Sequence, residues 1–87
     1  AKDGITVNNV LPGFTMTERL KSLIEQNANS QNKSVKEIEK EFMSKIPMNR
    51  FGLPEEIASS VSFLCSKEAA YINGINLPVD GGFTKSL

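Results

Sequence analysis

The chain has 87 residues, of which 39% are apolar, and its ten basic and ten acidic side chains give a formal net charge of zero. This length suits one small domain and leaves no room for a second core. Because no block of like charge interrupts the balance, the sequence disfavours a nucleic acid or an anionic membrane surface as a partner.

The residue types also limit the chemistry of the chain. The single cysteine, Cys65, excludes an internal disulfide framework, and without histidine there is no zinc site, catalytic thiol or serine nucleophile. We expect Cys65 to be a buried, inert thiol because it closes the apolar run 61–65. No stretch approaches the roughly 18 apolar residues of a membrane helix, and no signal leader opens the chain, so a cytoplasmic location is predicted.

The first strand is expected at residues 5–11. The chain starts at Ala1 without a methionine, and Gly4 has the place of a residue that closes an earlier helix, so we interpret the chain as a fragment. The run Ile5 to Leu11 is apolar and β-branched with little alternation, which is typical of a parallel strand covered on both faces. Such a strand needs neighbours.

Pro12 and Gly13 stop this strand. Proline removes a donor from the ladder and glycine permits a sharp turn, which leaves backbone groups and the hydroxyls of Thr15 and Thr17 at the carboxyl end of the strand. Ligands bind at that end of parallel α/β sheets. We therefore interpret the turn as one wall of a cofactor site whose other walls are absent from the chain.

Two amphipathic helices are expected next, within residues 16–46. Thr17 can cap the first, which we expect to fade in the polar stretch 26–32. Ser34 and Glu37 match a capping box for the second, which should end before Pro47. The apolar faces predicted for these helices are Leu20, Leu23 and Ile24 in the first, and Val35, Ile38, Phe42 and Ile46 in the second.

A third helix, 54–66, and a last strand, 75–80, complete the pattern. Pro54 suits the first position of the helix, and Asn73-Gly74 is a turn signal before the strand. Pro78 favours an edge position or a bulge. A strand, helices and a second strand predict a long helical crossover between parallel strands. The buried stripe of the third helix should be Ile57, Ala58, Val61, Leu64 and Cys65.

Four stretches, in this order and spacing, resemble the short-chain dehydrogenase/reductase family. They are a Pro-Gly with threonine five positions after the proline (9–17), a Pro-x-x-Arg-x-Gly-x-Pro-x-Glu-x-Ala segment (46–58), a helix end and turn (63–66 and 70–74), and a last strand (79–82). The resemblance covers essentially all of residues 1–87. It implies an α/β fold: the carboxyl-terminal part of a single Rossmann-type, doubly wound parallel sheet, with its last two parallel strands and about three helices.

The resemblance also implies a function. The chain would be part of an NAD(P)-dependent oxidoreductase that interconverts a carbonyl and an alcohol by hydride transfer, of the 3-oxoacyl-thioester reductase type. The Thr17 hydroxyl and backbone groups around Phe14 and Thr15 would hold the nicotinamide carboxamide. The cofactor-binding residues so implied are Pro12, Gly13, Phe14, Thr15 and Thr17.

Residues 16–46 would form the substrate lid of such an enzyme. Leu20, Ile24 and Phe42 would then face substrate, or they would only pack the two helices together, as apolar stripes commonly do. Both alternatives stay open. Phe14 is equally a candidate for facing the substrate and for packing.

Other parts of such an enzyme are absent from the sequence. No G-x-G-x-x-G turn is present, and the family's catalytic Ser, Tyr and Lys should lie upstream of Ala1. Tyr71 has Ile75 where a Tyr-x-x-x-Lys motif requires lysine, so it is expected to be a packing or turn residue. We predict no catalytic residue in the chain, which alone should be inactive and should not bind NAD or NADP tightly; its substrate stays open.

The predicted partners are the missing amino-terminal part of the same protein and further copies of it, joined through the last helix and strand, with no nucleic acid, membrane or metal. The alternative is a non-catalytic association module that pairs with another copy through its strand edges and last helix. Arg50 is expected to anchor a loop, pair with Glu55 or touch a cofactor. Asp80-Gly81-Gly82 is expected to be a turn and an inter-subunit contact.

Overall fold

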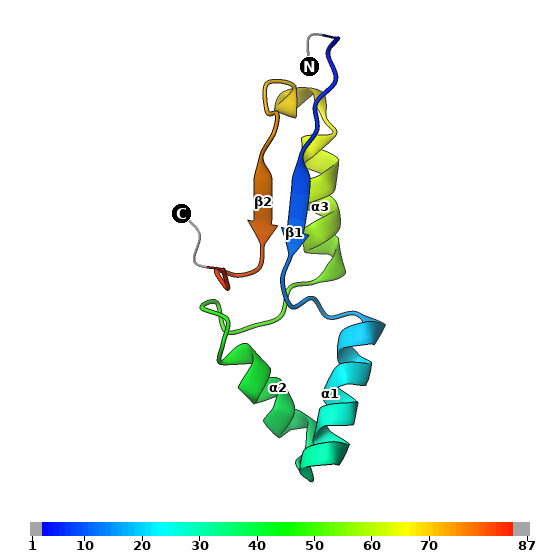
Figure 1. Ribbon diagram of the computed structural model, residues 1–87, viewed down its shortest axis with the longest axis vertical. Helices are drawn as coiled ribbons and strands as arrows, with labels where there is room; N and C mark the ends of the chain where they lie inside the picture. The colour runs from blue at the N-terminus through cyan, green and yellow to red at the C-terminus, as the bar shows by residue number, and fades with distance from the viewer. Residues whose placement is uncertain (1–2, 85–87) are drawn as a thin grey trace.

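A computed structural model describes residues 3–84 and shows an elongated body of 56 × 25 × 16 Å (Figure 1). Its radius of gyration is 16.4 Å, against about 12 Å for a globular domain of this length. The difference arises because two units pack separately. A two-stranded sheet with one helix lies at one end, and a pair of helices lies at the other.

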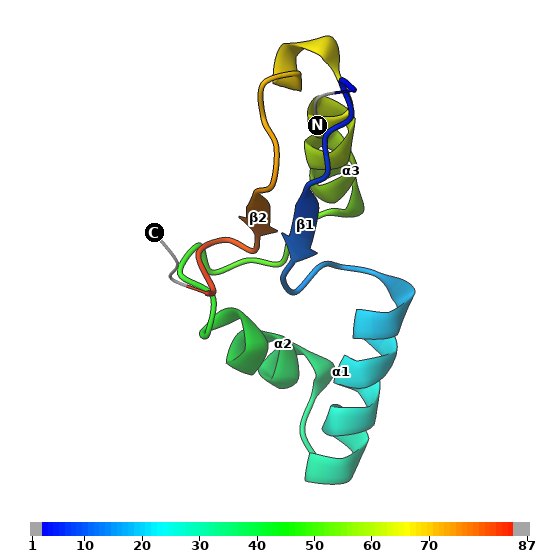
Figure 2. The ribbon, with the colours of Figure 1, turned by 45° about the horizontal axis from the view of Figure 1, so that its top comes forward.

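The sheet consists of β1 (Asn9–Pro12) and β2 (Asn76–Val79), which pair in parallel as predicted, with Val10 opposite Leu77. β1 ends at Pro12 as expected but starts later than the predicted residue 5. The reason is that Val7 meets a turn instead of a strand: its N–H donates to Asn73 Oδ1 (2.9 Å), and its carbonyl accepts from Gly74 N–H (2.9 Å). Both strands point their carboxyl ends toward the helix pair (Figure 2).

The expectation that the first strand is covered on both faces was wrong for the described residues. Thr6, Asn8 and Val10 line one cavity with α3, so that face of the sheet has a helix over it. On the opposite side Leu11 of β1 is 45% exposed, and Ile5 and Val7 before the strand are 65% and 69% exposed. Side chains alternate along a strand, so a single helix can cover only one of the two sets.

Helix α1 (Glu18–Gln31) is capped by Thr17 as predicted, whose Oγ1 accepts from Leu20 N–H (3.3 Å). The predicted fading over 26–32 was wrong. Ala28 is buried against the second helix, and Asn32 ends α1 in the left-handed conformation (φ 54°) with its N–H directed at the last carbonyls. Asparagine tolerates this conformation, which lets it act as a C-cap.

Helix α2 (Val35–Met43) has the predicted capping box, with Ser34 Oγ accepting from Glu37 N–H (3.2 Å) and Glu37 Oε1 accepting from Ser34 N–H (3.1 Å). It ends three residues before Ile46, which is buried in the turn that follows. Val35 is exposed, contrary to the predicted apolar face. The core between the helices comprises Leu20, Ile24, Ala28, Ile38, Ile46 and Phe51, with Phe14, Met16, Phe42 and Met43 packed against it.

Helix α3 (Pro54–Leu64) starts at the predicted proline, ends two residues before the predicted 66, and precedes a 3₁₀ turn, η1 (Lys67–Ala69). Its predicted buried stripe was wrong: Ile57 and Leu64 are half-buried, and Ala58, Val61 and Cys65 are exposed. The reason is that two short strands offer too little surface to cover a whole helix face. Tyr71 is fully exposed in a turn, so it does not pack. Within residues 3–84 no helix has the length and apolar character that crossing a membrane requires.

Candidate functional site

The turn after β1 is held against the end of β2. Gly13 N–H donates to Val79 O (3.1 Å), and the Gly13 backbone lies directly on Asp80. A Cβ at position 13 would lie 2.5 Å from Asp80 Cβ and 2.8 Å from its Cα, which no side chain can occupy. Glycine is therefore required here by close backbone approach, and the two strand ends are fixed relative to each other.

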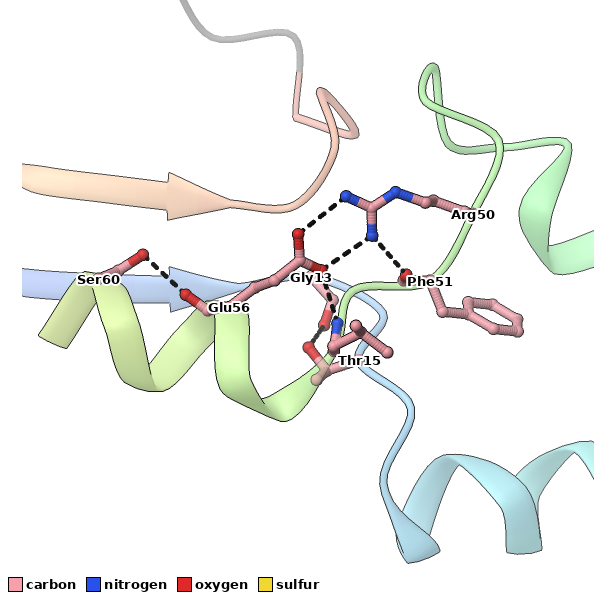
Figure 3. A network of polar contacts seen from close by, with 7 residues as sticks. Gly13, Thr15, Arg50, Phe51, Glu56 and Ser60 are labelled. Atoms are coloured by element: carbon pink, nitrogen blue, oxygen red, sulfur yellow. Dashed lines mark hydrogen bonds and ion pairs between the residues drawn. The ribbon is translucent and has the colours of Figure 1, made fainter.

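The chain then pairs with a segment from the far side of the helix hairpin. Gly52 N–H donates to Phe14 O, and Met16 N–H donates to Gly52 O, both at 2.9 Å. The Thr15 hydroxyl donates back to Gly13 O (3.1 Å) and closes the turn (Figure 3). Among residues 3–84, nothing forms a hydrogen bond with the peptide N–H or C=O of Thr15.

A cavity of about 520 Å³ lies between this turn and the first half of α1. Helix α1 contributes Arg19 and Leu20 to it, among others. Because the Thr17 hydroxyl accepts the α1 cap bond with a lone pair, its hydrogen stays available as a donor. All five residues that the sequence singled out for a cofactor line this one cavity, namely Pro12, Gly13, Phe14, Thr15 and Thr17.

The three predicted lid residues lie in different surroundings. Leu20 lines the cavity, although it is mostly buried. Ile24 is only 2% exposed and belongs to the core between α1 and α2, so the packing alternative applies to it. Phe42 is half-buried and its ring lies 5.5 Å from that of Phe14, which also meets Phe83 edge-on at 5.3 Å. Phe14 thus joins the turn to α2 and to the segment after β2.

Arg50 forms a two-pronged ion pair with Glu56, and not with Glu55 as one alternative had it (Figure 3). Nη1 and Nη2 each lie 2.8 Å from a carboxylate oxygen. The sequence holds a signal for this partner that the prediction missed. Pro54 starts the helix, so Glu56 is its third residue, where a glutamate side chain turns back toward the preceding loop.

This pairing changes the ionisation of both groups. The hydrogen bonds from Arg50, and then the one from Leu53 N–H, favour the charged carboxylate and lower the pKa of Glu56 to about 2. The same contact raises the pKa of Arg50. The pair therefore stays charged on both sides down to strongly acidic conditions.

The Glu56→Gln variant is expected to change how stability falls in acid. A carboxyl whose pKa is lower in the folded chain stabilises it above the unfolded pKa, and this contribution is lost as the pH falls from 4.5 toward about 2. Thermal unfolding followed by circular dichroism should show the gap between wild type and variant closing across that window. Glu55→Gln, which removes the same charge from the same turn of helix, should keep the wild-type acid profile; an identical change in both variants would contradict the assignment.

Asp80 organises the loop after β2. Its carboxylate accepts from Gly82 N–H (2.9 Å) and Thr84 N–H (3.1 Å). Desolvation alone would raise the pKa of Asp80, but these hydrogen bonds outweigh it and the pKa lies below its ordinary value. Gly81 and Gly82 have positive φ, and their backbones lie against the side chains of Ile46 and Pro47. Residues 80–82 therefore form the predicted turn. Its role between subunits stays a prediction.

Comparison with known proteins gives consistent matches. Residues 1–84 match the family model described as enoyl-(acyl carrier protein) reductase. The NADPH-dependent reductase BacG of Bacillus subtilis is 40% identical over 87 residues, which is 100% of this chain and 34% of that protein. The 3-oxoacyl-[acyl-carrier-protein] reductase FabG of Vibrio cholerae is 42% identical over 82 residues, 94% of this chain and 29% of that protein.

The structural comparison agrees. The crystal structure of a short chain dehydrogenase family protein from Francisella tularensis superposes with a TM-score of 0.93 at 38% identity, covering 98% of this chain and 35% of that one. The chain therefore spans about a third of the length of the relatives it matches.

Proposed function

Because the chain belongs to the short-chain dehydrogenase/reductase family, we propose that it supplies the nicotinamide-side wall and the substrate lid of an NAD(P)-dependent oxidoreductase. Its two parallel strands and three α-helices are the carboxyl-terminal part of the Rossmann-type fold of that family. The enzyme interconverts a carbonyl and an alcohol. The chain alone is inactive, because the sequence holds neither a Tyr-x-x-x-Lys pair nor a glycine-rich phosphate loop.

The observation that carries this proposal is the convergence of the five turn residues on one cavity at the carboxyl end of β1. A nicotinamide carboxamide presents one acceptor and two donor hydrogens, and it needs partners in fixed positions. The Thr17 hydroxyl has a hydrogen to donate, and the Thr15 peptide has both a donor and an acceptor that residues 3–84 leave unpaired. These groups fit the carboxamide and orient the ring, while the bound cofactor supplies or takes up the hydride.

Part of the cavity wall is apolar. Phe14, Leu20 and Leu23 line it, and α1 bounds the cavity on the side of the helix pair. Such a wall suits the acyl part of a carbonyl substrate. FabG of Vibrio cholerae and a further relative support a 3-oxoacyl thioester as that substrate; the latter is the acetoacetyl-CoA reductase of Allochromatium vinosum, 37% identical over 82 residues.

Thr17→Val tests the proposal in the protein encoded by the complete reading frame that contains this chain. Valine keeps the shape of threonine but removes the hydroxyl, and with it both the α1 cap bond and the proposed donor to the carboxamide. The KM for NADH or NADPH should rise about tenfold with acetoacetyl-CoA as oxidant, whereas Thr17→Ser, which keeps both bonds, should stay close to wild type. Oxidation of the cofactor is followed by its absorbance. Thr6→Val is the matched control, because Thr6 precedes β1 and lines the separate cavity beside α3, and it should behave as wild type. Absence of cofactor oxidation by the wild-type protein, or an unchanged KM in Thr17→Val, would contradict the proposal.

A further inference from the structure

We infer that the Arg50–Glu56 pair is a positioning device for the cofactor wall, acting through Gly52 on the backbone from Phe14 to Met16. This inference rests on the proposed function and adds two residues that do not line the cavity. Their effect would reach the cofactor only through the peptide groups between them.

The backbone from Phe14 to Met16 depends on Gly52 for its position. Phe14 O accepts from Gly52 N–H and Met16 N–H donates to Gly52 O, so one residue holds both peptides that flank Thr15. No other hydrogen bond ties Phe14 O or Met16 N–H to the described residues. The Thr15 peptide, which is the group proposed to meet the carboxamide, therefore takes its position from Gly52.

Gly52 is in turn held by the Arg50–Glu56 pair. Arg50 Nη1 donates to the carbonyl of Phe51 (3.1 Å), and Glu56 Oε1 accepts from the N–H of Leu53 (2.8 Å). The ion pair thus binds the peptide groups on both sides of Gly52. Figure 3 shows Arg50 joined to both Glu56 and the carbonyl of Phe51. The N–H and C=O of Gly52 pair with the turn.

The Arg50–Glu56 pair affects the position of Gly52 more than the stability of the fold. The Arg50 and Glu56 side chains are 48% and 40% exposed, and an ion pair so open to solvent contributes little to folding by itself. Its two parallel hydrogen bonds, however, fix geometry, and lysine cannot reproduce them because it carries a single ammonium group. The pair is anchored on both sides. Phe51, beside Arg50, is buried in the core between α1 and α2, and Glu56 belongs to α3, which packs on β1.

Arg50→Lys in the complete protein is the decisive variant. We expect the KM for NAD(P)H to rise about fivefold, with the KM for acetoacetyl-CoA and the melting temperature close to wild type. Glu56→Gln should raise the KM for NAD(P)H in the same way, beside the loss of stability already expected of that variant above pH 4.5. In the double variant this KM should be no higher than in the more affected single variant, because both residues act through one contact. Glu55→Gln is the matched control and should leave all three quantities unchanged.

The outcomes distinguish this inference from the proposed function. A raised cofactor KM in Thr17→Val together with wild-type kinetics in Arg50→Lys overturns the positioning role and keeps the proposed function. A lower melting temperature in Arg50→Lys, together with a rise in the KM values for both NAD(P)H and acetoacetyl-CoA, also overturns it. The pair would then stabilise the fold as a whole and would not position the cofactor wall alone. Failure of the wild-type protein to oxidise NAD(P)H overturns the proposed function itself.

Discussion

Replacing Gly13 with alanine is expected to lower the free energy of unfolding by about 3 kcal/mol, the upper range for overpacking a fixed site. The added Cβ would meet the Cβ and Cα of Asp80 at 2.5 and 2.8 Å, and neither atom is the movable tip of a side chain. The ends of β1 and β2 must separate, which also breaks the bond from Gly13 N–H to Val79 O. Urea unfolding followed by circular dichroism measures the loss.

Gly52→Ala is the control for this prediction. A Cβ at position 52 would lie 3.8 Å from its nearest neighbours, an ordinary contact, and the backbone there is not in the left-handed region. The change should alter stability by less than about 1 kcal/mol. An equal loss in the two alanine variants would show that the contact with Asp80 is not what requires glycine at position 13.

The Ile38→Ala variant should separate α1 from α2, at a cost of about 3 kcal/mol. Ile38 is 1% exposed and lies in the core that joins the two helices, so truncation removes buried apolar area and leaves a cavity. Hydrogen exchange should then show faster opening of the amides of both helices. The sheet at the other end of the body should be affected much less, because the two units pack separately.

Val35→Ala on the same helix is the matched control. Val35 is 43% exposed and lies outside the core, so its truncation should cost less than about 1 kcal/mol. Exchange rates that rise equally in the two variants would contradict the assignment of Ile38 to the core between α1 and α2.

Helix starts could be predicted from the sequence because their signals are local. Thr17, the Ser34–Glu37 box and Pro54 each act within one turn of the helix they begin. The end of α1 could not be predicted in this way. A stretch as polar as 26–32 stays helical because Ala28 packs on α2, and that contact depends on how the chain folds back.

The predicted cofactor wall needed only the Pro-Gly turn and its neighbours in sequence, and the structure brings those residues to one cavity. The contacts that hold the wall come from far along the chain. Gly13 meets Asp80, and the turn pairs with Gly52, neither of which a local pattern indicates. The exposure of α3 could not be predicted either. An apolar stripe on a helix predicts a surface that covers it, and residues 3–84 provide only part of such a surface.

A crystal structure of the complete protein with NADPH bound tests most directly whether the turn after β1 holds the nicotinamide. We expect the ring to lie in the cavity between the turn and α1. Its carboxamide should then be about 3 Å from Thr17 Oγ1 and from the backbone of Thr15. A nicotinamide ring outside this cavity, with neither group within about 4 Å of the carboxamide, would contradict the proposal.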